Sequence, residues 1–233
     1  MKKLVLMVLV LAIGIGTQAQ TRNVEKQEAV SKSEDIYLNF KFADEIKVEQ
    51  WDKNEIAIAV SVYLDNGEGN EAFNLKTERT SGQVKIYSDF GNYFEERQKR
   101  WKDRKGSYNS NTEIDYVVKV PKGANLKVKS ISGSMEVPSY VGNLKTDLIS
   151  GDVTLKKYNG ELRLKTVSGD LDVTMNKARI DAKTVTGTIY SDLDIQKDGG
   201  RNSGQNRIKG TVNNGNEPVV LTTVSGNIYM RKG

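Results

Sequence analysis

The chain has 233 residues, enough for one large domain, and its formal net charge of +5 is too small to indicate nucleic acid binding. It contains no histidine and no cysteine, which excludes the commonest general base, the usual zinc and copper ligands, disulfides and thiolate chemistry. Short alternating apolar runs, with 21 glycines and ten tyrosines, favour β-structure.

Residues 1–19 have the features of a secretory signal peptide. Two lysines precede an apolar run over 4–15, and small residues at 17–19 provide a cleavage site. The apolar run is shorter than the ~20 residues that a bilayer span needs. We therefore expect export to the periplasm, the outer surface or the extracellular space, with no transmembrane span in the mature chain. Residues 20–33 are polar and aperiodic, which predicts a flexible leader before a single domain over 34–233.

Alternating, strand-like runs over 36–42 and 55–63 are followed by a segment of a different kind. Residues 92–111 mix basic and aromatic side chains, and we expect them to form a loop that leaves the main body of the domain. Cations beside aromatic rings bind anionic glycans or lipid head groups through charge and stacking. The candidate contact residues are Arg97, Arg100, Trp101 and Arg104. The alternative is a solvated connection between two strands, with one helical turn.

The C-terminal half repeats one short motif. A serine or threonine followed by glycine recurs at residues 132, 150, 168 and 186, so that 18 residues separate each copy from the next. A fifth copy lies at 225, and LKTERTSGQVKI, over 75–86, is a diverged copy. A fixed period of this kind is typical of solenoids. The repeated glycines, expected at one corner of each coil, are Gly133, Gly151, Gly169, Gly187 and Gly226.

Aligning the copies on this pair places the apolar residues in four columns. The columns begin at Leu126, Val128, Ile131 and Met135 and alternate with polar positions, which is a strand pattern. Because the apolar parity changes before each Ser-Gly pair, we predict a bend there that keeps all four columns inside. The predicted fold is an all-β parallel β-helix, or solenoid, with coils of ~18 residues stacked ~4.8 Å apart. We expect residues 198–206 to form a second loop and the fifth copy to end the stack.

Several stretches resemble a known family. IDYVVKVPKGANLKVKSISGSMEV over 114–137, preceded by VEQWDKNEI over 48–56 and followed by the VSG-type copies, resembles the bacterial putative-adhesin family of secreted β-helix domains. The chain also resembles the related head domains of auto-transporter adhesins. The resemblance covers most of the mature chain. It implies a β-helix in the cell envelope and supplies no catalytic motif.

Two aspartates raise the question of an enzymatic or metal site. Asp152 and Asp170 directly follow corner glycines, so stacking would place their carboxylates on adjacent coils, where they could share a metal ion or act as an acid and a base. Common turn formers occupy the same position in the other copies: Ser134, Thr188 and Asn227. We therefore interpret the aspartates as turn residues, with a metal site as the alternative.

The long, flat faces of a solenoid favour a non-enzymatic envelope or surface protein that needs no cofactor. We expect its partner to be an envelope glycan or another envelope protein, and not a nucleic acid, because the chain is exported. A polysaccharide-active β-helix enzyme and an accessory protein of the envelope stress response are the alternatives. Arg231 and Lys232 place like charges on the last coil, which favours a monomer.

Overall fold

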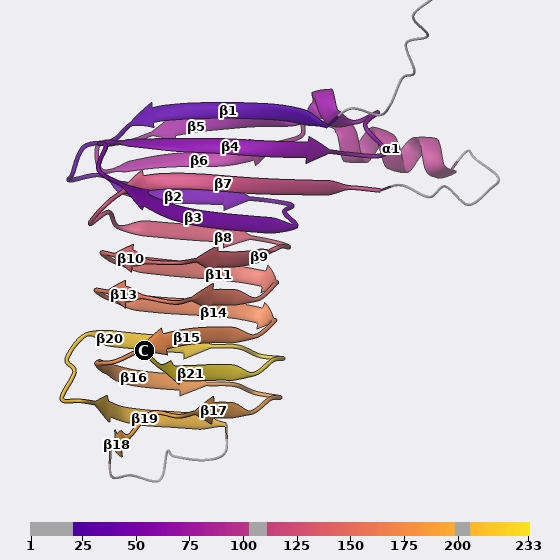
Figure 1. The fold of residues 1–233 in the computed structure, drawn as a ribbon. Coiled ribbons are helices and arrows are strands. Elements are labelled where there is room, and N and C mark those ends of the chain that lie inside the picture. Colours follow the sequence, from indigo (N-terminus) through magenta and orange to yellow (C-terminus); the bar gives the residue numbers. More distant parts are fainter. Residues whose placement is uncertain (1–20, 103–110, 199–205) are drawn as a thin grey trace, which may run out of the picture.

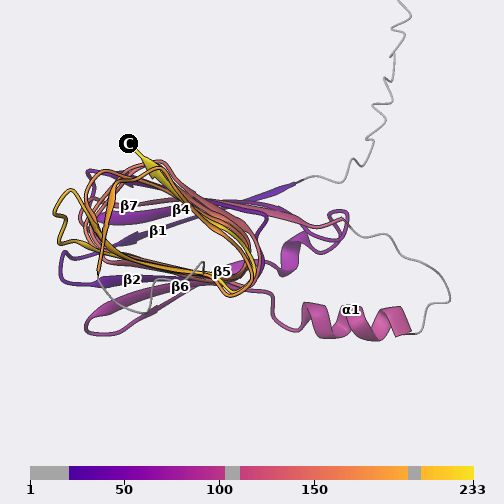
Figure 2. The same cartoon turned by 90° about the horizontal axis from the view of Figure 1, so that it is seen from below.

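The computed structural model describes residues 21–102, 111–198 and 206–233, and its strands form two large sheets that face each other (Figure 1, Figure 2). In spatial order, the nine-stranded sheet A contains β1 (Arg22–Ala29), β4 (Glu55–Tyr63), β7 (Glu113–Pro121), β3 (Glu45–Trp51), β9 (Ser134–Val137), β12 (Val153–Leu155), β15 (Leu171–Met175), β21 (Ile228–Lys232) and β17 (Ile189–Ser191). The ten-stranded sheet B contains β5 (Asn74–Arg79), β6 (Gln83–Asp89), β2 (Asp35–Phe40), β8 (Leu126–Ser130), β11 (Leu144–Ser150), β14 (Leu162–Ser168), β20 (Pro218–Thr222), β16 (Ala178–Lys183), β19 (Arg207–Val212) and β18 (Ile195–Lys197). The remaining elements are a narrow third sheet of β10 (Tyr140–Val141) and β13 (Tyr158–Asn159), the short 3-10 helix Asn70–Ala72 and the helix α1 (Tyr93–Lys102).

The repeat copies stack as parallel rungs. A rung is one strand of sheet B, a Ser/Thr-Gly corner and one strand of sheet A. In sheet B, Leu126, Leu144 and Leu162 are directly paired neighbours on β8, β11 and β14. In sheet A, β9, β12 and β15 also pair in parallel. The described chain is therefore all-β apart from its short helices, with long parallel sheets and a solenoid-like stack.

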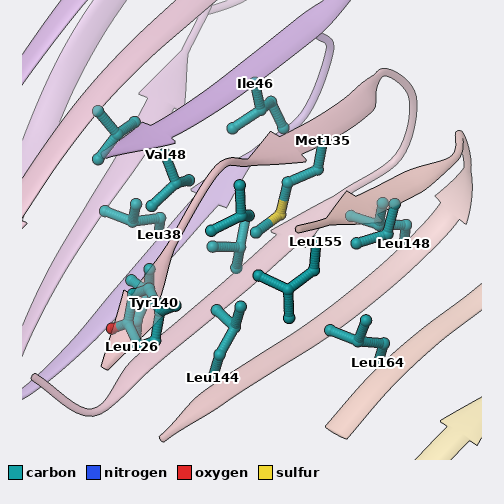
Figure 3. Packing of buried hydrophobic residues seen from close by; sticks show 14 of the residues in the cluster. Leu38, Ile46, Val48, Leu126, Met135, Tyr140, Leu144, Leu148, Leu155 and Leu164 are labelled. Atoms are coloured by element: carbon teal, nitrogen blue, oxygen red, sulfur yellow. The ribbon is translucent and has the colours of Figure 1, made fainter. Parts of the chain in front are cut away.

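The core lies between the inner faces of the two sheets. Because side chains alternate across a strand, every second residue points inward, and these positions hold the aliphatic residues. Figure 3 shows how Leu126, Leu144, Leu155 and Leu164 point into this space from successive strands, and all four are almost fully buried. One continuous cluster of such residues runs through the rungs.

The fifth copy lies inside the stack, so the prediction that it ends the stack is wrong. β20 pairs with β14 on one side and with β16 on the other, so that Val219 lies between Leu162 and Ile180. In sheet A, β21 lies between β15 and β17 in the same way (Figure 1). The chain passes from β15 to β16 and leaves one rung position empty between them. The strands β20 and β21, which come later in the sequence, occupy this position, and we call them the inserted rung. Copy order in the sequence therefore differs from copy order in space.

Antiparallel strands cover both ends of the stack. At one end, β19 pairs with β16 and β18 pairs with β19. The Asp181 carboxylate of β16 forms ion pairs with two side chains of β19, Arg207 at 2.9 Å and Lys209 at 3.3 Å. Burial raises the pKa of Asp181, but these two cations outweigh burial and lower the pKa overall. At the other end, β4 runs antiparallel to β7, and β5 runs antiparallel to β6.

Three predictions for the N-terminal half need correction. The expected flexible leader contains the strand β1, which pairs along its whole length with β4. Its polar residues fit an edge strand, one face of which meets solvent. The diverged copy over 75–86 is the antiparallel hairpin β5–β6 and not a parallel rung. The expected loop over 92–111 contains the ten-residue helix α1, which projects from the stack (Figure 2).

Some predictions fall outside the described residues. These are the signal peptide over 1–19 and the parts of the two expected loops over 103–110 and 199–205. Within the described ranges, no helix is both long and apolar enough to cross a bilayer.

Candidate binding surface

The corner glycines stack so closely that no side chain fits between them. A Cβ atom added to Gly169 would lie 2.2 Å from the carbonyl oxygen of Gly151, and one added to Gly226 would lie 2.0 Å from that of Gly169. Both residues also have a positive φ, +150° and +152°, which disfavours other residue types. Gly187 meets the Gly226 carbonyl oxygen in the same manner, and Gly133 meets Ala43.

Buried threonines fasten each corner to its neighbour. The hydroxyl of Thr166 donates to the carbonyl oxygen of Gly151 at 3.0 Å, and Thr223 donates to Gly169 at 3.0 Å. Thr184 completes the series with Gly226 as its acceptor. The threonines are at most 1% exposed, so these bonds satisfy hydroxyls that water does not reach.

These threonines explain why one predicted apolar column is on the outside. β14 runs from Leu162 to Ser168 without the predicted bend, so Thr166 faces inward and Val167 faces solvent. Val167 and its equivalents in the other rungs are 38–51% exposed. The equivalents are Ile131, Ile149, Val185 and Val224. We call this set the aliphatic edge. It follows the corner side of the stack from rung to rung.

The two candidate aspartates form a hydrogen-bonded ladder. The Asp152 carboxylate accepts the backbone N–H of Asp170 at 2.8 Å, and Asp170 accepts that of Asn227 at 2.6 Å. Asn227 in turn accepts the N–H of Thr188 at 3.1 Å. Each side chain therefore links its own rung to the next. In the part of the chain that the structure describes, no three acidic side chains gather closely enough to hold a metal ion.

The outer face of sheet B carries rows of cations. Lys127, Lys145 and Arg163 are directly paired neighbours on adjacent strands. In a second row, Lys165 and Lys183 flank Thr222 of the inserted rung. We call these side chains the basic face: Lys127, Lys129, Lys145, Arg163, Lys165 and Lys183.

Few carboxylates compensate the basic face. Lys165 lies 3.4 Å from Asp147, and Arg163 pairs with Glu161. Within the described ranges, Lys129, Lys145 and Lys183 form no ion pair. On the outer face of sheet A, Lys47 and Arg231 are paired with the carboxylates of Glu49 and Asp172.

One of the predicted contact residues, Arg97, anchors the helix α1 to the rest of the domain. Arg97 lies 3.0 Å from the Asp65 carboxylate, and their side chains are only 17% and 5% exposed. The Tyr93 hydroxyl donates to the same carboxylate, and burial together with this bond raises the pKa of Tyr93. Arg100 lies over the Tyr93 ring, 5.9 Å from its centre. The side chain of Trp101 and all of Arg104 lie outside the described residues.

We expect Arg97→Gln to lower the free energy of unfolding by about 2 kcal/mol, because Asp65 would stay buried without its cation. Urea unfolding followed by circular dichroism measures this change. Arg100→Gln is the matched control, and its effect should stay within about 0.5 kcal/mol. Equal effects of the two changes would contradict the anchoring role of Arg97.

Neither the basic face nor the row of inward-facing threonines at the corners was predicted, although both have a signal in the sequence. Thr166, Thr184 and Thr223 each lie two residues before the Ser or Thr of a corner. The lysines of the basic face occupy the polar positions that alternate with the apolar columns. Alternation identifies such positions as outward, and a cation repeated there predicts a charged face.

Comparison with solved structures gives a likeness in fold. A "putative cell adhesion protein" from Clostridium sporogenes is 13% identical, with a TM-score of 0.60 over 92% of this chain and 100% of that chain. A "putative adhesin" from Bacteroides fragilis is 11% identical, with a TM-score of 0.33 over 94% of this chain and 100% of that one. No curated protein matches the chain. The model of the family Toastrack DUF4097 matches residues 105–231, more than half of the chain, which therefore belongs to this family.

Proposed function

We propose that the chain is a non-enzymatic, adhesin-like protein of the cell envelope that binds an acidic envelope glycan along the basic face. The observation that carries this proposal is the group of outward cations on β8, β11, β14 and β16, in which Lys127, Lys145 and Arg163 are directly paired on three adjacent rungs. The proposal includes export through a cleavable signal peptide and a solenoid with coils of ~18 residues. The fold likeness to a solved structure named a putative cell adhesion protein supports the adhesin-like part, and a relation to auto-transporter head domains stays a prediction.

A linear polyanion suits this face for geometric reasons. Backbone ladders fix the rungs at a spacing of ~4.8 Å, so Lys127, Lys145 and Arg163 form a straight row. The second row, from Lys129 to Lys183, also contains Asp147 and Thr222. A polymer with one charge on each sugar can meet several of the cations at once, and each contact adds to the others without further loss of overall freedom. Lys129, Lys145 and Lys183 can take part without giving up an ion pair within the described ranges.

The alternatives have weaker support. An enzyme needs carboxylates that can reach a substrate, whereas Asp152 and Asp170 accept backbone N–H groups of neighbouring rungs. A role in the envelope stress response has no observation in its favour. A second candidate partner is another envelope protein, which the exposed aliphatic edge favours because apolar side chains commonly lie at the centre of protein interfaces.

The proposal predicts that Lys129→Gln, Lys145→Gln and Lys183→Gln together weaken binding of polygalacturonate about ten-fold or more, because three cation contacts are lost. Raising the salt concentration should weaken wild-type binding in the same direction. Calorimetric titration of the mature chain measures both effects.

The matched control changes Lys47, Lys53 and Lys119 to glutamine, which removes the same charge on or beside sheet A. Binding should then stay close to that of the wild type. An equal loss in both triple variants would mean that net charge alone attracts the polymer, and the basic face would lose its role. Ile149→Ser with Val167→Ser tests the aliphatic edge, and a glycan bound on the basic face alone is insensitive to it.

A further inference from the structure

The inserted rung leaves a cleft on the narrow side of the stack. On this side β10 and β13 pair in parallel, and the next segment in space is not a third strand of that sheet. The chain crosses instead from β15 to β16 at 175–178, and the residues before β20 enter from β19. Between these segments lies a cleft of about 550 Å³. It is therefore the place where the repeat is broken.

One hydrogen bond from a side chain and one between backbone groups hold the walls of this cleft. The Asn213 amide donates to the carbonyl oxygen of Asn176 at 2.6 Å, which joins the entering segment to the crossing segment. The N–H of Arg179 donates to the carbonyl oxygen of Glu217 at 2.9 Å. A site with fixed walls loses little freedom when a ligand binds.

The lining combines apolar surface with several amides and lysines. Asn159, Asn176 and Asn216 each offer a donor and an acceptor, the combination that matches neighbouring hydroxyls of a sugar. Lys157 and Lys177 add two cations, and within the described ranges neither forms an ion pair. The volume is in the range of known small-ligand sites, ~300–1,000 Å³.

Tyr158 supplies an aromatic wall and an unusual hydroxyl. Its ring packs against the core, and its hydroxyl is shielded from solvent without a hydrogen-bond partner within the described ranges. Because solvent does not reach this hydroxyl, the ring is the part of Tyr158 that a ligand in the cleft can contact. Burial, and then the nearby Glu217 carboxylate, raises the pKa of Tyr158, so the phenol stays a donor.

We propose that this cleft binds a short acidic sugar of one to three units. The asparagine amides and Glu217 bind its hydroxyls, Tyr158 packs on the ring, and Lys157 and Lys177 bind its carboxylate. This site is separate from the basic face, and a surface polymer could engage both. The break in the repeat thus supplies a second, more selective contact than the uniform face.

Trigalacturonate is the probe, and neutral maltotriose is its comparison. We expect trigalacturonate to titrate saturably into the mature chain and to bind about ten-fold more weakly when Lys157 and Lys177 are both changed to glutamine. Tyr158→Phe should leave both binding and stability close to those of the wild type, because the ring that packs on the sugar is kept and the shielded hydroxyl has no partner within the described ranges. Calorimetry and thermal unfolding provide the two measurements.

The control is Lys145→Gln with Lys183→Gln on the basic face, which should leave trigalacturonate binding unchanged. Equal affinity for maltotriose would overturn the acidic class of ligand. The absence of saturable binding, or binding insensitive to the Lys157 and Lys177 changes, would overturn the site. If polygalacturonate still depends on the basic face in that case, the proposed function stands while this inference fails.

Discussion

Replacing Leu221 with aspartate is expected to prevent the chain from folding. Leu221 is fully buried in β20 and lies directly between Leu164 and Ala182 of the two adjacent rungs. Loss of a buried leucine side chain alone costs about 2–5 kcal/mol, and a charge without a partner adds to this cost. The total is comparable to the ~5–15 kcal/mol by which most domains are stable.

The position of the rung makes this effect large. A change in a terminal coil would loosen only the end of a solenoid, whereas a change in β20 separates β14 from β16 in the middle of the core. Far-UV circular dichroism and the yield of soluble protein measure the result. Val220→Asp, on the outward side of the same strand, is the control and should leave a folded protein. A cooperative unfolding transition of the Leu221 variant near that of the wild type would place β20 at the end of the stack.

Gly169→Val is expected to lower the free energy of unfolding by about 3 kcal/mol or more. A Cβ at this position would lie 2.2 Å from the carbonyl oxygen of Gly151, and backbone cannot move away as a flexible side chain can. The positive φ adds strain for any residue with a Cβ, and more for a branched one. The same carbonyl oxygen accepts the Thr166 hydroxyl, so a displacement would also break that bond.

Gly82→Val is the control for this prediction. Gly82 lies in the turn between β5 and β6, and a Cβ there would meet nothing within 4 Å. Its effect on the free energy of unfolding, measured by urea unfolding, should be within about 1 kcal/mol. Similar losses at Gly82 and Gly169 would show that valine in any turn is responsible, and close stacking of the corners would not explain the result.

The repeat spacing predicted the local register well. Leu126, Leu144 and Leu162 fall in one column of the alignment and are neighbours in sheet B. This agreement has a simple cause, because strands with one buried face pair where their apolar positions coincide. The order of the later rungs could not be predicted in this way. Val219 and Ile180 are both apolar residues of that column, so either fits beside Leu162 and the pattern does not choose between them.

The role of the candidate contact residues depends on partners elsewhere in the chain. A dense cluster of charge drew attention to 92–111, but Arg97 belongs to a partly buried ion pair with Asp65, a residue distant in sequence. Sequence pattern does not reveal such a partner. The cations of the basic face are spread one or two to a strand, and only the stacking of strands brings them together. The cleft depends on a crossing between non-adjacent rungs, for which no local signal exists.

The inserted rung also determines the order in which the chain can fold. During synthesis, β14 and β16 become available before residues 218–232. Their apolar columns match at a spacing of 18 residues, so they can pair with each other first. The final segment must then separate them before it takes its place between them. A chain in which β14 and β16 have paired must break this well-matched but incorrect strand pair, a kinetic trap that a solenoid built in chain order avoids.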